Sequence, residues 1–163
     1  MPIISLSSFI NKAEDLTKLD SMYPIPEKPN TGDSYSFPSN ADNLSDYQID
    51  NWLAFFGVWK GRMNYEISGI EGKLYVLEQG YELVLSTKIA ALEADSPKKL
   101  LKDSLKGQAI LEDSQLQELK ITIIEMNGQL RILRGRLSLY ESQFDTISRL
   151  ITRRGQERQK LSI

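Results

Sequence analysis

The chain has 163 residues, with 20 basic and 22 acidic side chains and a formal net charge of −2. It contains neither histidine nor cysteine, which excludes disulfide scaffolds, zinc sites built on these residues, and nucleophile systems that need either residue. The N-terminal sequence lacks the basic and apolar regions of a secretory signal, and no apolar stretch reaches the about 20 residues that a membrane-spanning helix needs. We therefore expect a soluble, cytoplasmic protein without membrane contact, cofactor or metal.

Residues 1–45 are predicted to form an acidic N-terminal arm ahead of a helical domain over residues 46–163. Residues 5–20 fit one short helix. Residues 21–45 hold four of the six prolines, and proline fixes φ and removes a backbone donor. We therefore expect a Pro-rich, extended linker there. Residues 1–51 carry three basic and eight acidic side chains, which makes this part of the chain acidic.

A long helical pattern follows, with Ser45 or Asp46 as its candidate N-cap. Its apolar residues recur in steps of three and four, which is the period of a helix and not that of a strand. The pattern predicts a helix over residues 46–93 that contains five glycines. Since glycine destabilises a helix, we expect these positions to allow the close approach of another segment. The apolar stripe consists of Trp52, Phe56, Trp59, Met63, Ile67, Ile70, Leu74, Leu77, Tyr81 and Val84.

A short connecting helix is predicted next, with Ser96 and Pro97 at its N-cap and first turn and its end near Lys106. Cations at the start of a helix oppose the helix dipole, so helix stability does not explain the lysines of this segment. We interpret them as a first group of candidate nucleic-acid-binding residues, which comprises Lys98, Lys99, Lys102 and Lys106.

The last third of the chain carries the most regular pattern. Its apolar residues alternate steps of three and four over five heptads, as a and d positions do. Such a stripe fits a helix of an intramolecular hairpin or bundle, and it equally fits a self-associating coiled coil. We predict an all-α fold in which the short helix joins two long antiparallel helices. The predicted oligomerisation residues are Leu116, Leu119, Ile123, Met126, Leu130, Leu133, Leu137, Tyr140, Phe144, Ile147 and Ile151.

Both long helices carry a second non-polar face. A helix that is apolar on two sides needs neighbours on two sides, and a hairpin of one chain covers only one side of each helix. We therefore predict a homo-oligomer. The second stripe of the last helix consists of Ile121, Ile124, Gly128, Ile132, Gly135 and Leu139, and that of the first long helix of Phe55, Val58, Tyr65, Gly69, Gly72, Val76 and Leu83.

Positive charge is concentrated at the end of the chain, where residues 131–163 hold eight basic and three acidic side chains. Arginine matches the geometry of phosphate with two parallel hydrogen bonds. Repeated around an oligomer, such a cluster suits single-stranded nucleic acid, with aromatic residues such as Trp59 and Tyr65 stacking on bases. Alternatively, these cations interact with the dipole at the C-terminus of a helix. The second group of candidate nucleic-acid-binding residues is Arg149, Arg153, Arg154 and Arg158, with Lys160 beside them.

No pattern indicates a catalytic site. The glycine-containing segments lack the spacing of a phosphate-binding loop. Acidic residues at helical spacing fit a solvated helix face. We therefore predict a protein that is not an enzyme.

The order of features resembles the UvsY family of bacteriophage recombination mediators. The segments that carry the resemblance are "DNWLAFFGVWKGRMNYE", a break with lysines, "LEDSQLQELKITIIEMNGQLRILRGRL" and "DTISRLITRRGQER", within residues 50–158. The resemblance implies an all-helical protein that assembles into a ring and binds single-stranded DNA. It also implies a role in loading a phage recombinase in place of single-strand-binding protein. The acidic arm lies outside the resemblance, and no DNA-contact residue is transferred from the family.

Two other functions fit parts of the same sequence. A helical structural or scaffolding component of a phage particle explains the stripes, the glycines and the arm equally well, but it does not predict binding to naked single strands. A membrane-surface helix using Trp52, Phe55, Phe56 and Trp59 lacks the lysine-rich polar face that such helices carry.

The opposite charges of the two ends suggest a regulatory hypothesis. The acidic arm is drawn to the basic surface and competes there with nucleic acid. The alternative is that the arm docks through Phe9, Tyr35 and Phe37 and has no regulatory role.

Overall fold

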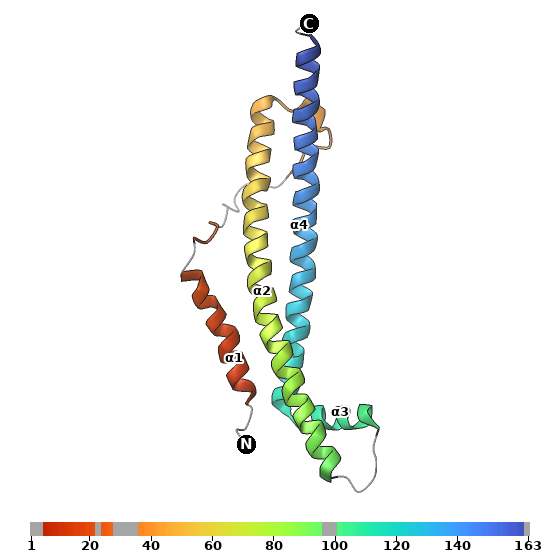
Figure 1. The fold of residues 1–163 in the computed structure, drawn as a ribbon. Helices are drawn as coiled ribbons and strands as arrows, with labels where there is room; N and C mark the ends of the chain where they lie inside the picture. Colours follow the sequence, from red (N-terminus) through yellow and green to blue (C-terminus); the bar gives the residue numbers. More distant parts are fainter. Residues whose placement is uncertain (1–4, 22–23, 28–35, 96–100, 162–163) are drawn as a thin grey trace. The chain divides into compact units, whose positions relative to one another are not determined.

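The computed structural model describes residues 5–21, 24–27, 36–95 and 101–161, and this part of the chain is all-helical without a strand. The predicted all-α class is therefore confirmed. Figure 1 shows the elements in chain order. They are α1 (Leu6–Asp15), the 3₁₀ turns η1 (Leu16–Ser21) and η2 (Ala41–Asn43), α2 (Asp46–Asp95), α3 (Lys102–Leu111) and α4 (Ser114–Leu161).

The chain divides into two compact units, each built from segments far apart in the sequence. Unit 1 combines Met1–Pro24 with Ser68–Arg131, and unit 2 combines Ile25–Ile67 with Ile132–Ile163. The first part of the predicted arm thus clusters with unit 1, and its later part clusters with unit 2. No helix of the described ranges has the length and apolar character needed to cross a membrane.

Ser45, one of the two predicted N-caps, forms a capping box with Gln48 at the start of α2. The Ser45 hydroxyl accepts a hydrogen bond from the Gln48 backbone N–H at 3.3 Å. In return, the Gln48 side-chain oxygen accepts from the Ser45 backbone N–H at 2.8 Å. This exchange satisfies two backbone donors that the first helical turn leaves without intrahelical partners.

The short connecting helix lies further along the chain than predicted. Its predicted cap, Ser96 with Pro97, falls outside the described residues, and α3 begins at Lys102, after an extended Leu101. The helix continues to Leu111 and not only to Lys106. The physical reason is burial, because Leu105 and Ala109 lie on one face of α3 and are each 1% exposed. Leu105 and Ala109 share this buried face only if the helix continues beyond Lys106.

The core of unit 1 uses the stripes predicted for both long helices. Their apolar side chains become buried within this unit together with residues of α1 and α3. Burial of each large aliphatic side chain is worth about 1.5–3 kcal/mol, so these stripes dominate the stability of the unit. The buried residues are Leu6, Ala13, Leu74, Leu77, Tyr81, Val84, Leu85, Leu105, Ala109, Leu116, Leu119, Ile123 and Leu130.

One glycine of α2 allows a close contact with α1. A Cβ atom at Gly80 would lie 2.5 Å from Cγ and 2.8 Å from Cβ of Phe9. Leu16 approaches Gly72 less closely, at 3.6 Å from the position of a Cβ atom. Phe9 therefore packs against α2 only because residue 80 has no side chain. At Gly57, Gly61 and Gly69, by contrast, an added Cβ would meet nothing within 4 Å.

The junction between α3 and α4 depends on Asp113. One carboxylate oxygen accepts hydrogen bonds from the backbone N–H groups of Gln115, at 2.9 Å, and Leu116, at 3.2 Å. The other oxygen forms an ion pair with Lys88 of α2. The hydrogen bond from Lys88 is the main reason that the pKa of Asp113 lies below its ordinary value. Asp113 thus caps α4 and connects it to α2 within unit 1.

Asp113→Ala is expected to lower the free energy of unfolding by about 1–2 kcal/mol, since it removes an N-cap. Asp113→Asn keeps a side-chain oxygen for the cap and loses only the ion pair, so its effect should be smaller. Because the pKa of Asp113 is lower in the folded chain, ionised Asp113 stabilises the fold at pH values above the pKa of an unfolded chain, which is about 3.9. This stabilisation is lost as the pH falls through the pKa of the folded chain. Chemical denaturation at pH 7 and near pH 3 should show the unmodified chain losing more stability than Asp113→Asn. Equal losses of stability in the unmodified chain and in Asp113→Asn would contradict a stabilising role for the charge of Asp113.

Gly80→Ala is expected to displace α1, because the new methyl group and the Phe9 ring cannot occupy the same space. Gly69→Ala is the matched control, since its position is open and alanine raises helix stability there by up to about 1 kcal/mol. Amide hydrogen exchange in α1 should become faster in the Gly80→Ala variant and should stay unchanged in the Gly69→Ala variant. Unchanged exchange in α1 would show that this contact does not hold it.

Candidate nucleic-acid interface

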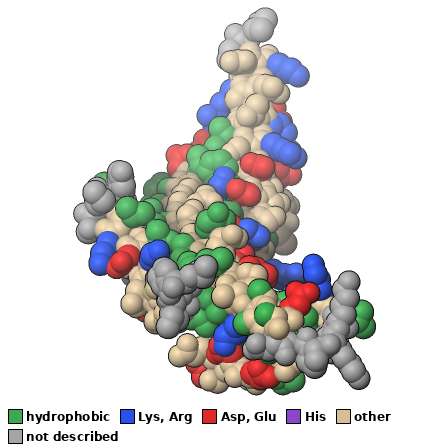
Figure 2. Space-filling view, turned by 60° about the horizontal axis from the view of Figure 1, so that its bottom comes forward, with side chains coloured by type: hydrophobic (Ala, Val, Ile, Leu, Met, Phe, Trp, Pro, Cys, Tyr) green, Lys and Arg blue, Asp and Glu red, His purple; other side chains and the backbone are tan. Residues whose placement is uncertain are grey.

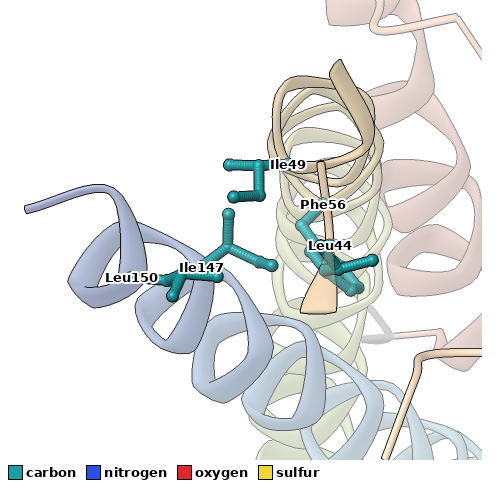
Figure 3. Packing of buried hydrophobic residues seen from close by; sticks show 5 residues of the cluster. All are labelled: Leu44, Ile49, Phe56, Ile147 and Leu150. Carbon is teal, nitrogen blue, oxygen red and sulfur yellow. The ribbon is translucent and has the colours of Figure 1, made fainter. Parts of the chain in front are cut away.

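The basic end of α4 lies beside a hydrophobic cluster of unit 2. Figure 3 shows Ile147 and Leu150 of α4 near Leu44, Ile49 and Phe56. All five side chains are buried, with Phe56 and Ile147 fully so. The cluster therefore fixes the last part of α4 against the start of α2.

Aromatic rings surround this cluster and include one residue of the predicted arm. The Phe37 ring lies 5.5 Å from Trp52 and 5.6 Å from Phe56, both in edge-on geometry. Trp52 stacks on Phe56 at 5.4 Å. Such ring pairs add about 0.5–1.5 kcal/mol each beyond the burial of area. Of the three docking residues hypothesised for the arm, Phe37 and Phe9 do pack against α2, and Tyr35 lies outside the described residues.

Three of the predicted arginines bind Asp42, which lies in η2, or Asp46, the first residue of α2. Arg153 donates to the Asp42 carboxylate at 2.5 Å. Arg154 and Arg158 donate to the two oxygens of Asp46, at 2.9 Å and 2.5 Å respectively. The acidic N-terminal part of the chain therefore supplies carboxylates to the basic C-terminal part, as the charge distribution suggests.

These contacts shift the pKa of two of the groups involved. Hydrogen bonds from Arg158, and then from Arg154, hold the pKa of Asp46 below its ordinary value. The hydrogen bond with Asp42 raises the pKa of Arg153. Asp46 is thus ionised at neutral pH, and the guanidinium groups of Arg154 and Arg158 meet its negative charge.

Arg154 differs from its two neighbours in the depth and number of its contacts. Besides Asp46, its guanidinium donates to the backbone carbonyl of Asp42 at 2.8 Å and to that of Leu44 at 2.6 Å. Its side chain is 22% exposed, against 53% for Arg153 and 70% for Arg158. Arg154 therefore holds the segment before α2 in place, while Arg153 and Arg158 remain open to solvent on one side.

The end of α4 keeps a surplus of positive charge after this pairing. Residues 149–160 hold five cations and one carboxylate, that of Glu157, and the ion pairs with Asp42 and Asp46 add two carboxylates, which leaves an excess of two positive charges. Figure 2 shows Lys and Arg side chains gathered along the part of the chain that leads to the C-terminal residues. Arg149 and Lys160 are exposed as well, so cations occur on either side of the paired arginines along α4.

The predicted lysine group belongs to the other unit. Lys102 and Lys106 are exposed side chains of α3 in unit 1, whereas the arginines belong to unit 2. Lys98 and Lys99 lie outside the described residues. The structure therefore brings together the predicted arginines but does not join them with the lysines in one unit.

The aromatic residues proposed to stack on bases take part in internal contacts. Trp59 lies 6.2 Å from Phe55 and 6.1 Å from Tyr140. The Arg62 guanidinium lies 5.1 Å from the centre of the Tyr65 ring and donates to the Pro26 carbonyl at 2.9 Å. Both aromatic residues are half-buried, so their rings are used mainly for packing.

The stripe predicted to mediate oligomerisation is largely covered by its own chain. Leu116, Leu119, Ile123, Leu130 and Ile147 are buried, and five further members are half-buried, namely Met126, Leu133, Leu137, Tyr140 and Phe144. At the end of the stripe, Leu150 is 5% exposed and Ile151 is 39% exposed. The intramolecular interpretation of the stripe therefore applies within each unit.

No protein-family model, curated protein or solved structure matches this chain. Its similarity to the UvsY family therefore stays a prediction from the order of sequence features.

Arg154→Ala is expected to lower the free energy of unfolding by about 1–3 kcal/mol, because it removes the side-chain donor to the backbone carbonyls of Asp42 and Leu44, the second of them in a partly buried position. Arg153→Ala is the matched control, since an exposed ion pair contributes about 0–1 kcal/mol. Urea denaturation of the two variants measures both effects. A larger loss of stability in Arg153→Ala than in Arg154→Ala would show that Arg153, and not Arg154, holds the segment before α2.

Proposed function

We propose that this chain is a non-enzymatic, self-associating helical protein that binds single-stranded DNA through the basic end of α4. As in the family that it resembles, the activity would be that of a recombination mediator that helps to load a recombinase where single-strand-binding protein is bound. Such work takes place in the cytoplasm of the cell in which the DNA recombines. The partners are further copies of the chain, arranged as a ring, and single-stranded DNA.

Contacts of α2 with α4 within each unit support this proposal. In unit 2, Asp46 at the start of α2 contacts Arg158 near the end of α4, and in unit 1, Lys88 near the end of α2 contacts Asp113 at the start of α4. We propose that the two long helices run antiparallel, and each of these contacts supports that arrangement. We infer that the basic end of α4 therefore lies beside the start of α2 in every copy and would recur around an oligomer.

The observation that carries the proposal is the geometry of Arg153 and Arg158. Each has a solvent-exposed side chain and donates to one carboxylate oxygen at 2.5 Å. A phosphate offers the same kind of charged oxygen acceptor and has more oxygens than a carboxylate. Because exposed ion pairs contribute little, a DNA backbone can replace Asp42 as the ligand of Arg153 without unfolding the cluster around Phe56.

A structural component of a phage particle is the second candidate. The observation in its favour is the exposed apolar face of α4, which includes Ile121 and Ile132, at 56% and 60% exposure. That face explains assembly but requires no nucleic acid. The two candidates therefore differ in whether the protein binds naked single strands.

A titration of fluorescent single-stranded DNA at several salt concentrations tests the proposal. Log affinity should fall linearly with log salt, with a slope of about 0.7 per phosphate neutralised. The double variant Arg149→Ala with Arg153→Ala should bind more weakly and with a shallower slope. Asp42→Asn should bind more tightly at low salt, because it frees Arg153, and the difference should shrink as salt screens the charges.

Lys18→Ala is the matched control, since Lys18 is an exposed cation of unit 1 that pairs with Asp15. It should leave affinity and slope unchanged. If the unmodified chain shows no salt-dependent binding, the structural function is favoured. If binding is unaffected in the double variant, the arginines serve only to hold the segment before α2.

A further inference from the structure

The segment before α2 contributes an aromatic ring to the edge of the Phe56 cluster. We call this segment, residues 36–43, the strap, and it belongs to unit 2 together with the residues that it contacts below. The Phe37 ring meets Trp52 and Phe56 edge-on, at 5.5 Å and 5.6 Å. Phe37 is half-buried and packs against the cluster, but it is not one of the five buried members. The strap therefore covers the cluster from outside.

Asp42 supplies the negative charge of the strap. It lies in η2, where its backbone N–H donates to the Asn40 side-chain oxygen at 3.1 Å. Its carboxylate accepts a hydrogen bond from Arg153 at 2.5 Å, and its backbone carbonyl accepts one from Arg154 at 2.8 Å. The side chains of Asp42 and Arg153 are 61% and 53% exposed. An ion pair this exposed contributes little to stability, so another anion can take the place of the carboxylate.

Leu44 anchors the chain directly after the strap. Its side chain is 8% exposed and lies beside Phe56 (Figure 3), and its carbonyl accepts a hydrogen bond from Arg154 at 2.6 Å. Asp46, the first residue of α2, is held by Arg154 and Arg158. The strap can therefore leave its contacts while Leu44 and the start of α2 stay in place.

The two contact groups of the strap correspond to the two parts of a nucleotide chain. A base is a flat aromatic ring that stacks on aromatic side chains, and Phe37 presents such a ring to Trp52 and Phe56. A phosphate is an anion that arginine binds through charged oxygens, as Arg153 binds Asp42. Phe37 and Asp42 lie five residues apart, which spans at most about 18 Å. About five nucleotides cover that interval at about 3.4 Å each.

We propose that Trp52 and Phe56 form a subsite for a nucleobase, and that the strap occupies this subsite and Arg153 as an internal mimic of single-stranded DNA. When DNA binds, a phosphate replaces the Asp42 carboxylate and a base replaces the Phe37 ring. This inference rests on the proposed function, because it adds a base-binding subsite of α2 to the phosphate-binding arginines of α4.

Release of the strap makes the end of α4 more positive. With Asp42 in place, the five cations of residues 149–160 exceed the neighbouring carboxylates by two, and without Asp42 the excess is three. Two further exposed carboxylates, Asp50 of α2 and Asp145 of α4, lie one turn from Asp46 and Arg149 and do not belong to the strap. The exchange therefore strengthens the attraction for a phosphate backbone.

Phe37→Ala tests the mimic in a salt titration of single-stranded DNA. The variant should bind about tenfold more tightly, because the Phe37 ring no longer competes with a base. The salt slope should stay unchanged, since no charge is removed, whereas the gain in Asp42→Asn shrinks as salt rises. Phe9→Ala is the matched control, because Phe9 is a half-buried aromatic residue that packs against α2 in unit 1. Its affinity should equal that of the unmodified chain.

The outcomes separate the mimic from the proposed function. If the unmodified chain binds DNA and Phe37→Ala binds equally or more weakly, the mimic is overturned and the proposed function stands. If Phe37→Ala binds and the unmodified chain does not, the mimic is supported. Absence of binding in both would overturn the proposed function and the mimic together.

Amide hydrogen exchange of the unmodified chain tests the displacement without any variant. In the strap and at its end, the Asp42 N–H bonds to Asn40, and the Leu44 N–H bonds to the Ala41 carbonyl at 3.2 Å. A saturating thymidine oligonucleotide should make exchange faster at Asp42, because the turn loses its contacts with α4, and should not make it faster within α2. Unchanged or slower exchange at Asp42 would overturn the proposal, because it would show that DNA leaves the strap in place.

Discussion

Burial of one apolar stripe on each long helix is the interaction on which the rest of the structure depends. Neither α2 nor α4 has enough intrinsic helix stability to account for its length, and long helices in proteins gain their stability chiefly from packing. Within each unit, the stripes of both helices supply most of the buried side chains. One chain can cover only one side of each helix in this way. The second apolar stripe of α4, with Ile124 and Ile132 each 60% exposed, therefore stays open to solvent.

The distribution of charge follows from the same packing. The cluster around Phe56 and Ile147 brings the start of α2 beside the end of α4. Asp46 then meets two arginines, of which the less exposed, Arg154, also binds backbone carbonyls. The acidic beginning of the chain and its basic end are thus partners within unit 2. Arg153 and Arg158 are paired with carboxylates but remain exposed to solvent. A phosphate group could bind only to arginines that are exposed in this way.

The sequence alone predicts the parts of this structure that depend on periodicity. Steps of three and four residues locate α2 and the start of α4 to within a few residues, although α4 continues to Leu161, beyond the end of its predicted stripe at Ile151. Ser45 was one of two candidate caps for α2. Periodicity does not distinguish burial within a chain from burial between chains, so the role of the stripe through Ile123 stayed open. Charge counts show that the ends attract but do not identify Asp42 and Asp46 as the partners. The predicted start of α3 was too early, because the prediction relied on Ser96 and Pro97 as helix-start residues and did not include the burial of Leu105.

The central claim is that the chain covers one apolar stripe of α4 by itself, and we propose that further copies cover the second stripe, which includes Ile124 and Ile132. Sedimentation equilibrium of the unmodified chain and of an Ile124→Lys, Ile132→Lys variant measures this most directly. Both residues are 60% exposed, so the variant should fold with unchanged helix content. The account predicts that the unmodified chain associates with increasing concentration and that the variant stays monomeric. A monomer in both cases, or equal association of both, would contradict it.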